Sequence, residues 1–340
     1  MKEICSSRNN TSAQYLFLRM RRILFIMENF LFCLNATMPI FLLMVLGYMF
    51  RRIHLIDDHF VAQANKFVFA VPLPLLVFKD LSNSDFRATW DGKFVAFCFL
   101  VTLASIGIAF VLSLLFRKKV SQGEFIQASY RSSAALLGVA LITNIYGDMG
   151  MGPLMIIGSV PLYNIMAVVV LEFFKPEHGK INGALILKAL KGIITNPIIL
   201  GIAAGILWSL LKIPQPAIMS KTITYISNLA TPLGLIAMGA SFNPKKSTGS
   251  LFPAIVCSAM KLVGYAALFL PLAIALGFRE SQLIAILIML GSATTVSCFV
   301  MAKNMGHDGS LTSNVVMITT LFCAFTLTGW LYLLKTLALI

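Results

Sequence analysis

Two stretches of small and hydroxyl-bearing residues interrupt otherwise apolar sequence. Their members are Ser132, Ser133, Gly138, Ala140 and Asn144 in the first stretch, and Ala293, Thr294, Thr295 and Ser297 in the second. Hydroxyl, amide and freed main-chain groups can replace the hydration shell of a polar solute, and small residues allow a helix to unwind around it. We therefore predict that the two stretches form one binding site for a polar solute. Close packing of helices through small residues is the alternative for either stretch taken alone.

Three basic residues lie in or beside the apolar segments. Arg131 directly precedes the first stretch. Its guanidinium can hold a carboxylate through two parallel hydrogen bonds, or it can anchor the cytoplasmic end of a helix, and the sequence leaves both open. Lys66 and Lys261 can offset the charge of an anionic solute. For both lysines we favour the other interpretation, in which the aliphatic stem leads the ammonium group to the membrane surface.

The remaining polar residues indicate neither catalysis nor a metal centre. The sequence has no nucleophile, zinc or Walker motif, and its four histidines lack ligand spacing, so we expect them to be solvated. The six cysteines fit as small packing residues. Among the carboxylates only Glu172 falls inside a predicted span, which argues against proton coupling through a buried acid. A sodium site built from hydroxyls and carbonyls of the two stretches is compatible with the sequence, and no other cofactor is expected.

Composition places these residues in a helical membrane protein. Of the 340 residues 58% are hydrophobic and only 12% are charged, and the mean hydropathy is +0.87. Long continuous apolar runs with short polar links predict an all-α polytopic membrane protein. We expect ten transmembrane helices, at roughly residues 29–50, 60–80, 93–116, 127–146, 150–174, 192–212, 220–241, 251–277, 281–303 and 310–338.

The second half of the chain repeats short motifs of the first half. The stretches that begin at Pro39, Pro72 and Gly147 recur at Pro197, Pro232 and Gly306, which is 158 to 160 residues later. A duplicated unit with an odd number of spans must insert its copies in opposite orientations. We therefore predict two inverted five-helix repeats, residues 27–174 and 192–340, joined by a cytoplasmic linker of residues 175–191. Residues 1–26 form a polar and basic extension that we expect to be disordered or to lie along the membrane surface.

The net charge of +14 reflects topology in this interpretation and does not indicate a nucleic-acid partner. With residues 1–26 left out, thirteen lysines and arginines lie in links on one face of the predicted bundle and seven on the other. The face with more basic residues is retained in the cytoplasm. We therefore expect a multi-pass protein of the inner or plasma membrane with both termini outside.

Several loose motifs, in order and at matching spacing, resemble the auxin efflux carrier family over about residues 27–338. They are Met38-Pro39-Ile40-Phe41-Leu42, Asn65-Lys66-Phe67-Val68-Phe69, Arg131-Ser132-Ser133 followed by Gly138, Asn196-Pro197-Ile198, Pro232-Leu233-Gly234-Leu235, and Ala302-Lys303 followed by Thr319-Thr320-Leu321. The chain departs from the family where prolines usually break the fourth and ninth spans, since Ala140 and Ala293 stand there. Ser133 and Ser297 stand where the family has asparagines near the crossover.

The resemblance implies a fold like that of the bile-acid symporters, in which helices 4 and 9 are broken and cross each other. It also implies a scaffold of spans one, two, six and seven, dimerisation through this scaffold, and an elevator-like motion of the other spans. The expected function is efflux or exchange of small organic anions, such as dicarboxylates or auxin-like acids, by a secondary transporter of the bacterial malate or malonate permease kind.

Two other functions remain open from the sequence. The missing prolines are the argument for a sensor or scaffold that has the same fold and does not transport. A membrane-embedded enzyme is less well supported, because it would need a polar catalytic group of residues at one depth, and the sequence offers none.

Overall fold

Helices form every regular element of the described part of the chain. The computed structural model describes residues 2–82, 91–116, 119–134, 139–146, 150–175, 190–242 and 249–340. The first half contains α1 (Lys2–Arg52), α2 (Asp58–Ala70), α3 (Pro72–Ser82), α4 (Gly92–Ser113), α5 (Lys119–Tyr130), α6 (Val139–Tyr146) and α7 (Gly152–Phe173). The second half contains α9 (Pro197–Leu210), α10 (Ala217–Ser227), α11 (Ala230–Ser241), α13 (Leu251–Ala259), the π-helical turn η2 (Met260–Gly264), α14 (Tyr265–Ala275), α15 (Glu280–Gly291), α16 (Ser297–Asn304) and α17 (Ser310–Thr336).

Seven described segments are long and apolar enough to cross a membrane, where the sequence predicts ten spans. They are Met27–Arg52, Asp58–Ser82, Gly92–Ser113, Gly152–Phe173, Ala217–Ser241, Leu251–Ala275 and Ser310–Thr336. The three other predicted spans fall on the 14-residue helix α9 and on the pairs α5/α6 and α15/α16. Each of these helices is shorter than the roughly 20 residues that cross a bilayer. In the pairs α5/α6 and α15/α16, a non-helical stretch separates the two short helices.

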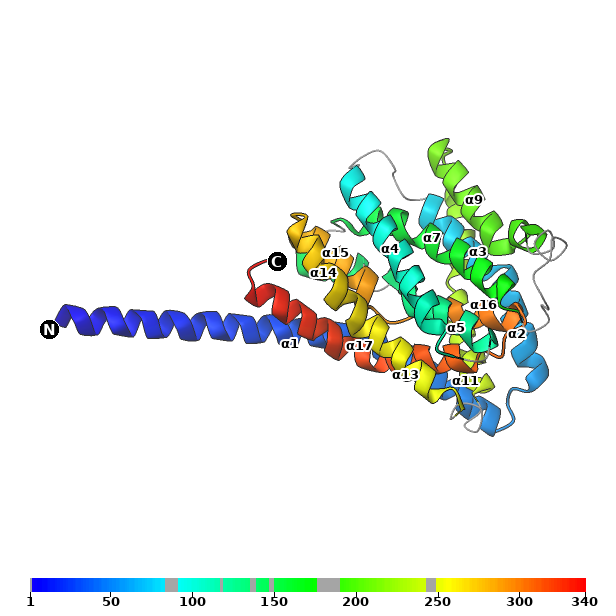
Figure 1. Ribbon diagram of the computed structural model, residues 1–340, viewed down its shortest axis with the longest axis horizontal. Coiled ribbons are helices and arrows are strands. Elements are labelled where there is room, and N and C mark those ends of the chain that lie inside the picture. The colour runs from blue at the N-terminus through cyan, green and yellow to red at the C-terminus, as the bar shows by residue number, and fades with distance from the viewer. Residues whose placement is uncertain are drawn as a thin grey trace.

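The N-terminal region is helical and not disordered, and the alternative expectation of a segment along the membrane surface stays a prediction. The helix α1 runs without interruption from Lys2 to Arg52, and its N-terminal part projects from the body of the molecule (Figure 1). Residues 2–38 contain neither glycine nor proline, so nothing in this stretch breaks a helix.

The helix starts of the two halves recur at a constant offset. From α2 to α7, each helix has a counterpart in the second half that begins 158 to 161 residues later. Packing between the halves recurs in the same way. A Cβ atom on Gly47 of α1 would lie 2.2 Å from the carbonyl oxygen of Ile236 on α11, and one on Gly205 of α9 would lie 3.0 Å from that of Phe78 on α3. These two pairs are equivalent under the offset of 158, so each half packs its first helix against the other half.

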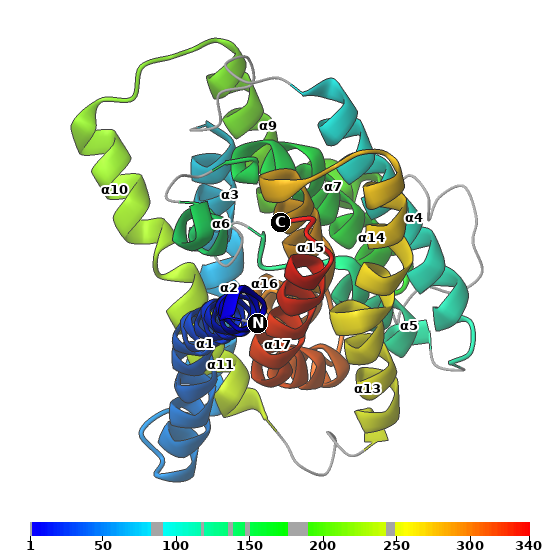
Figure 2. The ribbon, with the colours of Figure 1, turned by 90° about the vertical axis from the view of Figure 1, so that its left-hand side faces the viewer.

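The buried apolar side chains form two main clusters. One lies mainly among α4, α7, α14, α15 and α17, and the other mainly among α1, α2, α3, α9, α11 and α16. Figure 2 shows α1 beside α11 and α17, with α3 and α9 together at another side of the molecule. The five cysteines of the described body are buried and free, as the packing interpretation predicts.

Two residues that the sequence places near span ends are buried in the structure. Glu124 on α5 accepts hydrogen bonds from the main-chain nitrogens of Gly309 and Thr312, and from the hydroxyl of Thr312. It thereby satisfies the free N–H groups at the start of α17 and joins that helix to α5. The expectation of a solvated His307 was wrong, because its ring is buried with Nε2 2.9 Å from the carbonyl oxygen of Leu171.

Candidate functional site

Two breaks in helices meet at the centre of the molecule. The helix α5 ends at Tyr130, and residues 131–133 have no helical structure. The helix α15 ends at Gly291, and α16 begins at Ser297. The main-chain nitrogen of Ser133 in the first break donates to the carbonyl oxygen of Ala293 in the second, at 2.9 Å. The two stretches that the sequence singles out are therefore in direct contact.

The second break is held open by hydrogen bonds that replace those of a helix. The main-chain nitrogen of Thr294 donates to the hydroxyl of Thr319 at 3.1 Å, and the hydroxyl of Thr294 donates to the carbonyl oxygen of Ala128 at 2.9 Å. On α5, the Nε2 of Gln127 donates to the carbonyl oxygen of Cys298 on α16 at 2.8 Å. Side chains of α5 and α17 thus support the break at Ala293 without a proline.

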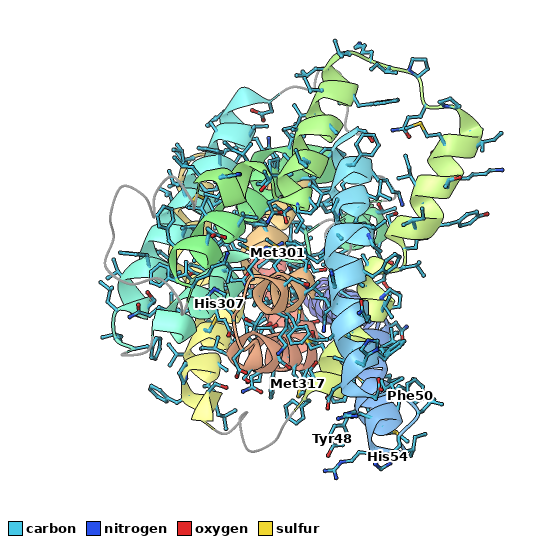
Figure 3. All side chains as sticks on the ribbon, turned by 90° about the vertical axis from the view of Figure 1, so that its right-hand side faces the viewer. Tyr48, Phe50, His54, Met301, His307 and Met317 are labelled. Atoms are coloured by element: carbon cyan, nitrogen blue, oxygen red, sulfur yellow. The ribbon has the colours of Figure 1, made fainter. Side chains whose placement is uncertain are left out.

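Arg131 crosses from the first break to the second. Its side chain is 2% exposed, and its Nη2 donates to Oδ1 of Asn164 on α7 and to Oγ of Ser297, each at 2.8 Å. Its Nη1 lies 2.9 Å from the sulfur of Met301, which Figure 3 places on α16 in the middle of the body. Its Nε has no hydrogen-bond partner among the described residues. The guanidinium is therefore oriented from several sides and keeps one donor unused.

A cavity of about 190 Å³ lies against both breaks. Its walls come from the breaks, from α7, and from α3 and the start of α11. The lining residues that bear polar side chains are Lys79, Asp80, Arg131, Ser132, Ser133, Tyr163, Asn164, Asn228, Thr231, Thr295 and Ser297. This volume is enough for a compact molecule of several non-hydrogen atoms.

The cavity includes some of the residues predicted from the sequence and not others. Those that line it are Arg131, Ser132, Ser133, Thr295 and Ser297. Ala293 and Thr294 are buried beside it, where they hold the breaks together. Asn144 is exposed on α6 and is not part of the lining, so its predicted place in the site differs from the observed one. Gly138 lies outside the described residues, and Ala140 lies on α6 with no description of its side chain.

The predicted position of Lys261 was also wrong. We expected its ammonium group to reach the membrane surface, but the side chain is fully buried and its Nζ donates to the hydroxyl of Ser132 and to nearby carbonyl oxygens. Lys66, in contrast, is exposed on α2. A lysine within an apolar segment looks the same in the sequence whether its ammonium group is buried or reaches the membrane surface. The two cases differ only in which side of the helix carries the lysine.

Comparison of the sequence with known proteins identifies the family to which the chain belongs. The family described as "Membrane transport protein" matches residues 32–331. The chain belongs to this family. It is the auxin efflux carrier family that the motifs resemble, and its members are transporters and not enzymes.

Two relatives align with 87–90% of the chain. A protein of Rhizobium meliloti (strain 1021), named "Putative malonate transporter", is 27% identical over 329 residues, which cover 90% of this chain and 97% of the relative. A protein of Methanothermobacter thermautotrophicus, named "Uncharacterized transporter", is 19% identical over 302 residues, which cover 87% of this chain and 96% of that relative.

Proposed function

We propose that the chain is a secondary transporter that exports or exchanges small organic anions, in particular mono- and dicarboxylates. The observation that carries this proposal is the buried guanidinium of Arg131 in the wall of a cavity between two helix breaks. A guanidinium binds carboxylates through charge-assisted hydrogen bonds, which gain strength away from water. The name of the Rhizobium relative points to a substrate of the same chemistry.

The charges around the cavity favour an anion. The partners of Arg131 are the neutral groups of Asn164, Ser297, Gln127 and Met301, and no described carboxylate forms an ion pair with it. On α3, Lys79 and Asp80 bring one charge of each sign to the lining. Basic side chains outnumber acidic ones in the described lining, which favours a bound anion.

We propose further that the protein has two inverted repeats of five spans and works by elevator-type alternating access. The recurring helix starts and the equivalent contacts of Gly47 and Gly205 support this arrangement. In this proposal the scaffold consists of α1, α2, α3, α9, α10 and α11. The helices on either side of the two breaks belong to the moving group. The cavity is lined from both groups, by Leu73 and Thr231 on the scaffold side and by Ser133 and Ser297 on the other. A solute bound there would be carried across as the moving group slides.

The location and assembly of the protein are part of the same proposal. We place it in the inner or plasma membrane with both termini outside, from the distribution of basic residues. We also propose a homodimer formed through the scaffold.

The breaks themselves weaken the alternative of a sensor that does not transport. That alternative rested on the missing prolines at Ala140 and Ala293. Since the break at Ala293 forms without a proline, the substitution there does not argue against a transport mechanism.

Binding followed by flux tests the proposal. Thermal unfolding of purified protein is measured with malonate, malate, succinate and an indole acid, and with malonamide as the neutral control for malonate. We expect at least one carboxylate to raise the unfolding midpoint and malonamide to have no effect. Uptake of the same acid into liposomes should follow. Equal stabilisation by malonate and malonamide would exclude Arg131 as an anion anchor, and binding without uptake would favour a sensor.

A further inference from the structure

The side chain of Lys261 ends in a cage of oxygen atoms where the two broken helices meet. Its Nζ lies 3.1 Å from the carbonyl oxygen of Leu290 and 3.3 Å from those of Tyr130 and Met289, and it also donates to the hydroxyl of Ser132. The side chain has no exposed surface. An ammonium group has three hydrogens to donate, and four oxygens surround it, so it is saturated.

These oxygens are of the kind that bind alkali cations. Three are main-chain carbonyls at the ends of α5 and α15, and the fourth is a hydroxyl. The last carbonyls of a helix have no partner within the helix, and the helix dipole makes that end negative. Such freed carbonyls and helix C-termini coordinate sodium in transporters with broken helices. The ends of two helices, one from each half of the chain, point to the same position here.

The cage surrounds the Nζ of Lys261 and contains no carboxylate. None of the described acidic residues forms an ion pair with Lys261, since both ion pairs of the described chain lie elsewhere, at Arg51–Asp58 and Lys175–Glu172. The oxygen cage alone compensates the buried charge, as it would for a metal ion.

The backbone is adapted to bring the lysine to this place. Lys261 lies in η2, a π-helical turn between α13 and α14. π-helical turns inside α-helices are rare and frequently occur at functional sites. The wider turn changes the direction of the side chains relative to a regular α-helix at Lys261 and beyond.

We propose that Lys261 is a tethered cation that occupies the place of a coupling sodium ion between the two breaks. The cage is a latent alkali-cation site, and wild-type protein binds no sodium there. Because Ser132 both accepts from Lys261 and lines the cavity, the fixed ammonium holds the first break in its binding geometry without a second solute. Transport is then independent of sodium. This last step rests on the proposed transport function, whereas the cage itself does not.

The test is the cation dependence of thermal stability in Lys261→Ala, Lys261→Met and wild-type protein. Each is purified in NaCl, KCl, LiCl and choline chloride, with Lys66→Ala as a control for loss of an exposed lysine. Removal of the ammonium in Lys261→Ala leaves the cage empty, so this variant should be destabilised in choline chloride. One of the alkali cations should then raise its midpoint by about 5 °C at saturation. Lys261→Met fills the same space with an apolar chain and should gain nothing, and wild-type and Lys66→Ala proteins should not respond to the choice of cation.

Each outcome of this test decides the proposal. Recovery of folded Lys261→Ala only when an alkali cation is present supports it, even if the variant cannot be purified in choline chloride. An equal response of Lys261→Ala to all four salts, or failure to fold in every salt, would overturn it. Sodium-dependent stability or uptake in wild-type protein would also overturn it. The stability measurement uses no organic anion, so a result that overturns the cation site does not contradict the proposed substrate class. A screen in which no anion binds likewise does not contradict the cation site.

Discussion

Arg131 is the charged side chain that connects the two halves of the candidate site. It lies in the first break and donates to Ser297 at the start of the second broken helix. Its bond to Asn164 adds a third element, the helix α7. These neutral acceptors orient the guanidinium and leave its positive charge for a solute, so the affinity for an anion should depend on this one side chain.

We expect Arg131→Gln to weaken binding of the transported anion about 10- to 100-fold, because charge-assisted hydrogen bonds contribute roughly 1.5–3 kcal/mol. Arg131→Lys should keep the charge but lose the planar pair of donors, and should lie between wild type and Arg131→Gln. Binding is measured by titration of purified protein, with the unfolding midpoint recorded for each variant.

Arg52→Gln is the matched control for this prediction, because it removes an exposed arginine at the C-terminal end of α1. Its guanidinium is bonded to Tyr48, which Figure 3 shows away from the middle of the body. The anion affinity of this variant should equal that of wild type. If Arg131→Gln binds the anion as well as Arg52→Gln does, Arg131 only holds the two breaks together.

Residue type and position in the repeat were enough to find the polar residues at the two breaks but not the polar lining on α3, α7 and near α11. Ser132, Ser133, Thr295 and Ser297 were predicted because small and hydroxyl-bearing residues rarely cluster within a span, and all four line the cavity. Asn144 and Lys261 could not be placed correctly, since sequence does not show which side of a helix faces inward. The π-helical turn that contains Lys261 was likewise not predicted from the spacing of apolar residues.

At the scale of the elements, the second helix break depends on its neighbours and not on a proline. Ser292 already has an extended backbone, with φ −78° and ψ 164°, which is the conformation preferred before a proline. Ala293→Pro should therefore change the free energy of unfolding by about 1 kcal/mol or less. Ala285→Pro, inside the buried helix α15, should cost about 3 kcal/mol or more, because it removes a helix hydrogen bond.

Thermal unfolding of both proline variants in detergent checks this expectation, and transport by Ala293→Pro should be retained. An equal loss of stability in the two variants would mean that residue 293 needs its N–H group or a conformation that proline cannot adopt.

The packing of α1 on α11 gives a second prediction for the elements. A Cβ atom on Gly239 would lie 1.9 Å from the carbonyl oxygen of Met44, so backbone must move to admit it. We expect Gly239→Ala to lower the free energy of unfolding by roughly 1–3 kcal/mol, as overpacking does. Gly107→Ala on α4 is the control, because nothing lies within 4 Å of its added Cβ atom, and it should stabilise α4 by up to about 1 kcal/mol. Equal midpoints for the two alanine variants would show that α1 and α11 separate without cost.

Hydrophobic runs located most of the helices because a bilayer requires long apolar segments whatever their tertiary contacts. They gave no indication that the N-terminal extension is helical, since its composition is polar; no glycine or proline interrupts α1 there, and the helix continues to Lys2. They also gave no warning that Glu124 would be buried, since its partners are N–H groups at the start of α17, far along the chain.

At the scale of the whole molecule, equivalent positions of the two halves of the chain lie in contact with each other, as the proposed inverted repeats require. The first helix of each half packs against the other half through equivalent glycines, Gly47 and Gly205, and the breaks of the two halves face each other at Ser133 and Ala293. The sequence predicted that the two stretches of small and hydroxyl-bearing residues come together, and it gave no prediction for the packing of the first helices. The repeated motifs did not specify the depth of the cavity or its wall on α3 and α11, because motifs do not show which side chains of these helices face inward.

A cross-link between the proposed scaffold and the proposed moving group tests the elevator mechanism. A Cβ atom on Gly234 of α11 would lie 3.3 Å from Cγ1 of Val296 in the second break, a separation close to what a disulfide requires. We expect the oxidised double variant Gly234→Cys with Val296→Cys to fold and to lose anion uptake at least about 10-fold, because a bond of fixed length prevents the groups from sliding several ångströms. Reduction should restore uptake in the same liposomes, and each single variant should transport with or without oxidant. Mass spectrometry establishes that the cross-link is complete. Uptake at the wild-type rate by fully cross-linked protein would mean that the anion crosses without motion between α11 and the second break, and the elevator mechanism would have to be replaced by one in which the breaks open locally.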